Sequence, residues 1–498
     1  MPAWGQYDGY MSYLARNQYV LQSGVPKVDV ALYRRAYDFT RDSPSPFPSD
    51  SLILAGYTYE YVSPENFKLP GVSVSDGRLA LEGPAYKAFV LSRIQNITVD
   101  AAEKLVEFAE NGLPIVIAGG VPVGIPGFDV DGTQNDRVKE LMEQLTALPV
   151  VRVVDDEEAV PGALESLGVS PVARTDPPSA SLYTIRRDRD ENATVSHFFL
   201  YNQNNVSINF TLTLEATGTP FILDAWSGDI TPVAIWNATD EGHIAIPGVQ
   251  LAANQTMLFA ITSEDSFEGV SAPSVHISSA DSDVFALSSS SGAEIRSFTE
   301  GSKEVVLSNG QRRTVNLSLG GEIERELTGW QLNITAWTPP ADLNQVDSVL
   351  VPHPVIGLSH RGLVPWDQLD GHENTSGVGT YTTTFEWAHD ENGGVGAQLD
   401  FGVVVHTLKA WLNGEVLPTA DLTRPVVDIT SLVREGSNVL RVDVASTLLN
   451  AVNAAPQVRS LGQLRTDTLR IPLSNQHYGL VVPVRLIPYG RETIGLDV

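Results

Sequence analysis

Residues able to do nucleophilic or metal chemistry are sparse in this sequence. It has no cysteine, which excludes a thiolate nucleophile, a disulfide and a Cys-ligated metal. It also lacks the G-x-S-x-G nucleophile elbow, and its nine histidines form neither H-x-x-x-H nor H-E-x-x-H. His353, His360 and His372 are neighbours in sequence but lie in loop-like segments. We therefore predict no metal site, no cofactor and no catalytic residue.

Carboxylates are plentiful, but their spacing favours structural roles. The run Asp155-Asp156-Glu157-Glu158 fits the solvated first turn of a helix, where acidic side chains stabilise the positive helix end. Asp224 and Asp229, in Leu223-Asp-Ala-Trp-Ser-Gly-Asp, fit turn formers better than the carboxylate pair of a glycosidase. The glycines of 119–127 lack both the G-x-G-x-x-G spacing and a Walker lysine, so they do not indicate a nucleotide site.

Aromatic residues carry the binding signal, because sugar rings stack on them while neighbouring polar groups bond the hydroxyls. Trp366 and Asp367 lie in a Pro/Gly-rich loop, and we predict them as a stacking face and a hydroxyl acceptor for carbohydrate. Packing of Trp366 in a core is the open alternative. Trp411, beside a hairpin turn, is expected to pack in a core.

Nine Asn-X-Ser/Thr sequons are present, more than twice the roughly three or four that composition predicts. Such sites accept N-glycans in secreted proteins, so we expect a secreted, extracellular chain. The residues after Met1 do not resemble a signal peptide, and we therefore expect a downstream part of a longer secreted protein. The acceptor residues are Asn96, Asn192, Asn205, Asn209, Asn237, Asn254, Asn316, Asn333 and Asn374.

Length and charge limit the class of protein to which this chain can belong. A chain of 498 residues predicts about three domains, and 42% hydrophobic residues can fill their cores. The net charge of −28 opposes nucleic-acid binding, and no apolar run approaches membrane-spanning length. We expect neither nucleic acid nor a membrane as a partner.

Hydrophobic periodicity divides the chain into an α/β part and all-β parts. Up to about residue 172, buried strands alternate with helices, which predicts a mainly parallel sheet. The expected elements are helices over 10–21, 99–110 and 136–148, and strands over 28–33, 88–91 and 114–120.

Beyond Asp176-Pro177-Pro178 the pattern changes to short alternating strands, first at 181–187, 197–201, 206–214 and 256–262. Asn413-Gly414 predicts a type I′ hairpin within 408–416.

Several segments together resemble known carbohydrate-active proteins. Segments 379–385, 399–402, 409–414, 427–433 and 435–442 resemble the galactose-binding-like domain of large glycoside hydrolases. Segments 13–30, 223–232 and 478–488 resemble the part that follows the catalytic barrel in α-L-rhamnosidases of glycoside hydrolase family 106.

The switch in hydrophobic period, together with this resemblance, predicts four regions: an α/β domain of flavodoxin or amidotransferase type (1–175), a β-sandwich (180–265), a linker with crossover strands (266–326) and a galactose-binding-like jelly roll (327–490). The resemblance also implies that the catalytic carboxylates belong to a barrel before residue 13, so none is assigned here. We expect the accessory part of a secreted hydrolase acting on rhamnose-containing plant glycans, with carbohydrate and that barrel as partners. The alternative is a stand-alone carbohydrate-binding or structural module without catalysis.

Overall fold

The computed structural model describes residues 1–34, 47–190, 192–289, 292–342, 344–345, 347–358, 362–388, 394–455 and 474–496. The chain forms two compact units. Unit 1 consists of Met1–Asn17, Asp224–Asp229 and Pro273–Val498, and unit 2 of Gln18–Leu223 and Ile230–Ala272. This division differs from the boundaries predicted from sequence, because strands distant in the chain pair with one another. None of the helices in the described ranges has the length and apolar character needed to cross a membrane.

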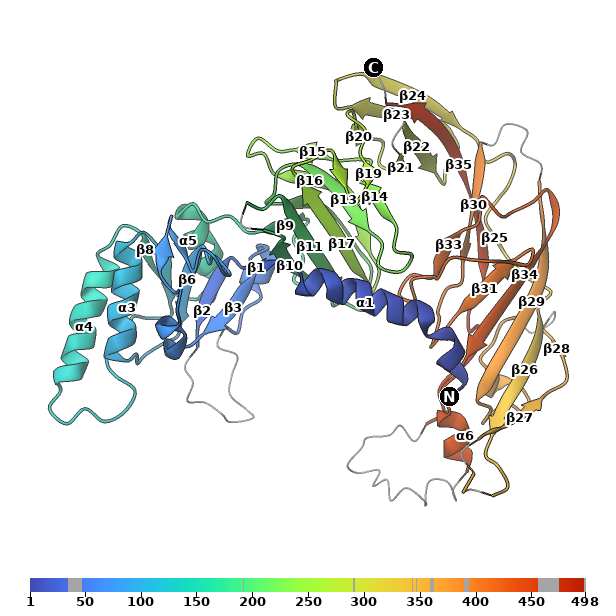
Figure 1. The fold of residues 1–498 in the computed structure, drawn as a ribbon, viewed down its shortest axis with the longest axis horizontal. Helices are drawn as coiled ribbons and strands as arrows, with labels where there is room; N and C mark the ends of the chain where they lie inside the picture. The colour runs from blue at the N-terminus through green and yellow to red at the C-terminus, as the bar shows by residue number, and fades with distance from the viewer. Residues whose placement is uncertain are drawn as a thin grey trace. The chain divides into compact units, whose positions relative to one another are not determined.

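Unit 2 begins with a parallel sheet covered by helices on both faces (Figure 1). In spatial order its strands are β3 (Tyr59–Val62), β2 (Val30–Tyr33), β6 (Ala88–Ser92), β7 (Ile115–Ala118) and β8 (Val151–Val154). The helices are α2 (Ser51–Leu54), α3 (Val99–Glu110), α4 (Thr133–Thr146) and α5 (Val160–Ser166), with 3-10 turns η2 (Pro64–Lys68) and η3 (Glu157–Ala159).

Burial on both faces explains the unbroken apolar runs of the central strands. Phe89 and Leu91 pack with α3 and α4, whereas Ala88 and Val90 pack with α2 and α5. The sequence-based prediction of a parallel α/β region is confirmed. The helix predicted to begin at 136 begins three residues earlier, at Thr133.

Two antiparallel sheets follow in unit 2 and enclose a second core. The six-stranded sheet contains β1 (Val25–Lys27), β10 (Leu182–Asp188), β11 (Val195–Asn202), β17 (Thr256–Thr262), β13 (Thr219–Leu223) and β14 (Ile230–Pro232). The four-stranded sheet contains β15 (Asn237–Ala238), β16 (Ile244–Leu251), β12 (Ile208–Leu214) and β9 (Ala173–Asp176). Two short hairpins complete unit 2: β4 (Val74–Ser75) with β5 (Arg78–Leu79), and β18 (Ser266–Phe267) with β19 (Val270–Ser271).

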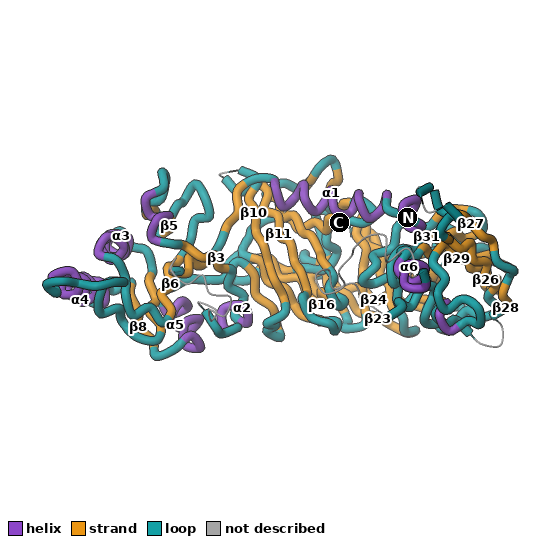
Figure 2. Tube along the Cα trace, turned by 90° about the horizontal axis from the view of Figure 1, so that it is seen from below, coloured by secondary structure: helices purple, strands orange, loops and turns teal. Residues whose placement is uncertain are grey.

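Unit 1 is mostly β, with η1 (Pro2–Gln6), the start of α1 (Asp8–Gln22), η4 (Trp366–Gln368) and α6 (Leu449–Ala454) as its helical segments in the described ranges (Figure 2). One sheet contains β21 (Val284–Ser289), β22 (Gly292–Ser297), β35 (Arg485–Gly495), β30 (Val395–Asp400), β33 (Val426–Asp428) and β25 (Arg325–Glu326). The second contains β27 (Val349–Pro352), β26 (Gln331–Thr338), β29 (Gly377–Trp387), β34 (Gly436–Ala445), β31 (Lys409–Leu412), β32 (Glu415–Val416) and β28 (Ile356–Gly357). A third comprises β20 (Ile277–Ala280), β23 (Gly301–Leu307) and β24 (Arg312–Leu317).

The first two sheets of unit 1 share one core, so the predicted all-β C-terminal region is confirmed. The hairpin between β31 and β32 turns at Asn413 (φ 53°) and Gly414 (φ 88°), the positive φ pair of a type I′ turn. The Trp411 ring is only half-buried and lies under the Arg441 guanidinium, 4.6 Å from the ring centroid. Trp411 therefore lies outside the core, contrary to prediction, because Ala410 and Leu412 occupy the core side of the strand.

Candidate functional site

Trp366, predicted as a stacking face for sugar, is fully buried in the core of unit 1. Its indole Nε1 donates to the Tyr381 hydroxyl at 2.7 Å. Glycines make room for the ring, since a Cβ at Gly379 or Gly479 would lie within 2.5 Å of it. A ring without exposed area has no face for a sugar, so the stacking role is wrong for this structure and the core alternative holds.

Asp367 lies at the surface edge of this core and faces a histidine that the sequence did not single out. His477 Nδ1 is 2.9 Å from Asp367 Oδ2, and the histidine side chain is 63% exposed. The pair can offer an acceptor and a ring nitrogen to a sugar hydroxyl. Asp367 therefore remains a predicted hydroxyl acceptor, without the aromatic platform beside it.

The remaining residues considered from sequence occupy structural positions. Asp224 Oδ1 accepts from the Trp226 backbone N–H at 2.8 Å, as expected of a turn former. His353 and His372 are in ring contact, with centroids 4.6 Å apart, and burial followed by the charge of His353 lowers the pKa of His372. His360 lies outside the described residues. Within the described ranges, no group of three His, Asp or Glu side chains could hold a metal ion.

Eight of the nine sequon asparagines are exposed, and the ninth, Asn96, is half-buried. An acceptor asparagine must be exposed to receive a glycan, and these eight meet that requirement. Asn192 has a second feature of interest, because it lines the cavity described next.

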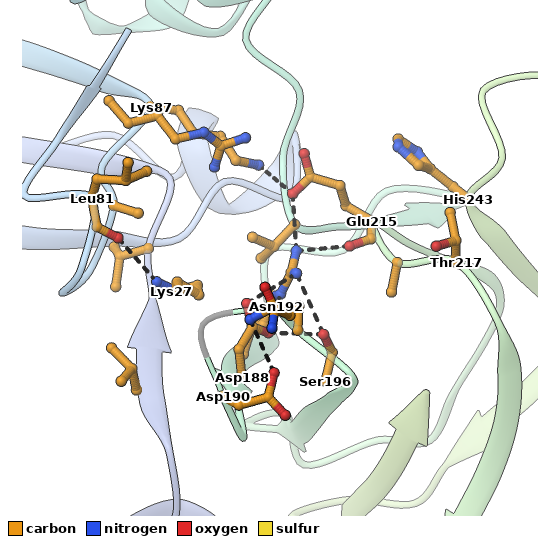
Figure 3. A pocket seen from close by; sticks show the side chains of 18 of the residues that line it. Lys27, Leu81, Lys87, Asp188, Asp190, Asn192, Ser196, Glu215, Thr217 and His243 are labelled. Atoms are coloured by element: carbon orange, nitrogen blue, oxygen red, sulfur yellow. Dashed lines mark hydrogen bonds and ion pairs between the residues drawn. The ribbon is translucent and has the colours of Figure 1, made fainter. Parts of the chain in front are cut away.

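A cavity of about 610 Å³ in unit 2 is the candidate functional site. One wall consists of β1 and residues 78–87, which lead into β6, and the other of β10, β11 and the segment after β12; β1 pairs with β10 at one edge. In Figure 3, Lys27 and Lys87 come from one wall, while Asp188, Ser196, Glu215 and His243 come from the other. Its volume is in the range of pockets that bind small ligands.

A continuous ion network links the two walls of the cavity. The buried Lys87 ammonium lies 2.8 Å from Asp29 Oδ1 and 2.5 Å from Glu215 Oε2. Glu215 also pairs with Arg186 at 3.3 Å, and Arg186 forms a two-point contact with Asp188 at 2.9 and 3.2 Å. These charges are mutually satisfied, so the network holds the α/β part to the β-sandwich.

Strand geometry explains how the second wall is assembled. Arg186 and Asp188 are two residues apart on β10, so their side chains leave the same face of the strand. Asp188 is also in register with Ser196 on β11, whose hydroxyl donates to Asp188 Oδ1 at 2.8 Å. Glu215 follows the last residue of β12.

The more accessible residues of the cavity offer both cations and hydroxyl-binding groups. Lys27 and Arg78 lie on one side, and Asp190, Asn192 and Thr217 also line the cavity. Asp190 Oδ2 accepts from the Thr194 hydroxyl, and this bond lowers the pKa of the Asp190 carboxyl. Asp190 is thus an ionised hydrogen-bond acceptor at neutral pH.

Three carboxylates of the cavity, Asp188, Asp190 and Glu215, are held by neighbouring side chains. A glycosidase needs two carboxyl groups placed across the scissile bond, one of them with a raised pKa. Here Asp188 and Glu215 are both committed to Arg186, and the pKa of Asp190 is lowered. The cavity is not apparent from the sequence, because its lining residues extend from Val25 to His243 and meet only in the fold. The same-face pair Arg186 and Asp188 was the only local signal.

Comparison with known proteins connects this chain to carbohydrate-active enzymes. Residues 2–235 match the model of glycoside hydrolase family 106, described as alpha-L-rhamnosidase. The fold of 97% of the chain is similar to a solved rhamnosidase from Novosphingobium sp. PP1Y, with a TM-score of 0.59 and 19% identity. A protein of Formosa agariphila named "Putative beta-glucuronidase" is 24% identical over 288 residues, which are 54% of this chain.

The chain spans 41% of the Novosphingobium rhamnosidase and 22% of the Formosa protein. The resemblance predicted from sequence is therefore confirmed: residues 2–235 match the alpha-L-rhamnosidase model of glycoside hydrolase family 106, and nearly the whole chain has the fold of part of a rhamnosidase.

Proposed function

We propose that this chain is an accessory, carbohydrate-binding part of a secreted glycoside hydrolase that acts on rhamnose-containing plant glycans. The match of residues 2–235 to the alpha-L-rhamnosidase family carries the proposal. The hydroxyl-binding groups of the unit 2 cavity support a carbohydrate ligand, and the exposed sequons support secretion. In this proposal, the catalytic carboxylates belong to a barrel outside residues 1–498.

The proposal extends to the finer classification of the two folds. The strand order β3-β2-β6-β7-β8 is 2-1-3-4-5 in chain order, which supports a flavodoxin-like α/β domain. The two sheets that share one core in unit 1 support a galactose-binding-like jelly roll. Both classifications would place this chain beside a catalytic domain rather than as one.

A titration with sugars tests the binding function. The pure chain is titrated with L-rhamnose, rhamnose-containing oligosaccharides and galactose oligosaccharides of equal length, followed by calorimetry and NMR. Because a shallow site desolvates few groups, we expect saturable binding with a Kd on the order of millimolar. No saturable binding of any carbohydrate would contradict the proposal and favour a structural module.

Two conservative variants locate the site. Asp190→Asn changes the cavity of unit 2, and Asp367→Asn changes the surface pair of unit 1. Each variant is the control for the other, because both remove one carboxylate charge with almost no change in volume. We expect Asp190→Asn to weaken carbohydrate binding and Asp367→Asn to leave the affinity unchanged. The reverse result would place the carbohydrate site in the C-terminal region.

A further inference from the structure

The cavity of unit 2 is lined by four Lys and Arg residues and five Asp and Glu residues, in a protein with a net charge of −28. Lys87 and Arg186 are paired with carboxylates, as described above. Lys27 and Arg78 also line the cavity, and neither forms an ion pair within the described part of the chain. Two cations without carboxylate partners in an acidic protein point to an anionic ligand.

The Lys27 ammonium is held in place by neutral groups. Its Nζ donates to the Gly83 carbonyl at 2.9 Å and to the Leu81 carbonyl at 3.3 Å. A lysine ammonium has three donors, so one N–H remains for a ligand. Burial lowers the pKa of Lys27, opposed by the charge of Asp188 and reinforced by Arg186 and Arg78. A bound anion would relieve this repulsion among cations.

The backbone that carries Arg78 is fixed by a tight turn. Arg78 pairs with Ser75 in the β4–β5 hairpin, whose two loop residues Asp76 (φ 51°) and Gly77 (φ 69°) have the positive φ of a type I′ turn. The Arg78 guanidinium makes no hydrogen bond within the described residues. Its planar fork is therefore available, and this geometry matches a carboxylate in a two-point contact.

The carboxylates that line the cavity form no ion pair with Lys27 or Arg78. Asp188 is bound in a two-point contact by Arg186, and Asp190 accepts from Thr194. Glu82 is exposed, and Glu241 lies 3.4 Å from His243 Nδ1.

We propose that Lys27 and Arg78 bind the carboxylate of an acidic sugar, a uronic acid unit of a glycan, while Asp190, Asn192 and Thr217 face its hydroxyls. This inference rests on the proposed carbohydrate function and adds the class of sugar. The cavity volume of about 610 Å³ leaves room for more than one sugar ring. The mixture of cations on one side and hydroxyl-binding groups elsewhere distinguishes this site from one for a neutral sugar.

Calorimetric titration of the full chain with digalacturonate, neutral galactobiose and citrate tests the inference. We expect digalacturonate to bind at least about ten-fold more tightly than galactobiose, corresponding to about 1.4 kcal/mol. Equal affinity for both disaccharides would overturn the inference. Citrate binding as tight as digalacturonate would also overturn it, because the site would then recognise carboxylate alone.

Two variants test whether Lys27 and Arg78 contact the carboxylate of the ligand. Arg78→Gln removes a guanidinium that makes no contact within the described residues, so it is expected to fold and to weaken digalacturonate binding about ten-fold. Lys27→Gln is expected to act similarly, and circular dichroism checks whether its loop contacts are needed for folding. Lys139→Gln on α4 is the matched control, because it removes an exposed positive charge from outside the cavity.

Unchanged digalacturonate affinity in folded Arg78→Gln would remove Arg78 from the site and overturn the inference. This result is distinguishable from failure of the proposed function. If only the carboxylate contact is absent, neutral rhamnose oligosaccharides still bind; if the proposed function is wrong, no carbohydrate binds.

Discussion

Replacing Lys87 by methionine should destabilise unit 2 strongly. The ammonium is buried between Asp29, which has no exposed area, and Glu215, and it also donates to the Ser170 carbonyl at 2.7 Å. Removing one member of a buried ion pair costs about 3–5 kcal/mol, because the partner remains charged and unpaired. Asp29 keeps bonds from Thr58 and Val172, so we expect the lower end, about 3 kcal/mol.

Hydrogen exchange followed by mass spectrometry measures the loss of stability separately in each unit. A loss of about 3 kcal/mol corresponds to roughly 100-fold faster exchange of the β6 amides when exchange requires unfolding of unit 2. The β29 amides of unit 1 are the internal reference and should keep their rates. The control variant is Lys104→Met, whose exposed pair with Glu107 should contribute less than about 0.5 kcal/mol.

Less than about three-fold acceleration in β6 would refute the assigned role of Lys87, as would equal acceleration in both units. A second variant checks the cause. Glu215→Gln in the Lys87→Met background removes one of the two carboxylates that have lost Lys87 as a partner, so it should recover part of the protection.

Three further predictions concern other residues. Burial, reinforced by the charge of Arg189, lowers the pKa of the 4%-exposed His197 from 6.5 to about 4. The contribution of the neutral ring to the free energy of unfolding is therefore fully present above pH 6.5 and is lost, by up to about 3 kcal/mol, as the pH drops toward 4. His197→Gln should flatten this pH dependence in urea titrations. Trp366→Ala should cost about 3–5 kcal/mol in thermal or urea unfolding, with sugar affinity unchanged wherever the variant is folded. Secretion from a eukaryotic host should add glycans removable by an endoglycosidase at several exposed sequons, and least at half-buried Asn96; an unmodified intact mass would contradict the secretory interpretation.

Local patterns predicted the elements whose geometry depends on neighbouring residues. The helix predicted over 99–110 from its periodicity and the following Asn111-Gly112 has these bounds in the structure, where Thr98 caps its first turn. The type I′ turn at 413–414 follows from the tolerance of Asn and Gly for positive φ. The parallel sheet was predictable because strands buried on both faces have unbroken apolar runs.

Long-range pairing decided the features that the sequence could not predict. The run 155–158 was expected to be solvated, but Glu157 is buried, because Arg93, far away in the chain, binds it at 2.7 Å. The burial of Trp366 depends on room left by Gly379 and Gly479, which belong to distant segments. The cavity likewise forms only because Lys27, Arg78 and Glu215 come together in the fold, and their spacing in the sequence does not predict this.

The central proposal is that this chain binds carbohydrate, while the catalytic carboxylates belong to a barrel outside residues 1–498. Its most direct test is the hydrolysis of an aryl α-L-rhamnoside by the pure, folded chain, followed by release of the coloured aglycone. Because the proposal places the catalytic carboxylates outside this chain, the expected rate is that of buffer alone. Measurable turnover that a single Asp or Glu substitution abolishes would contradict the claim and place a catalytic centre within this chain.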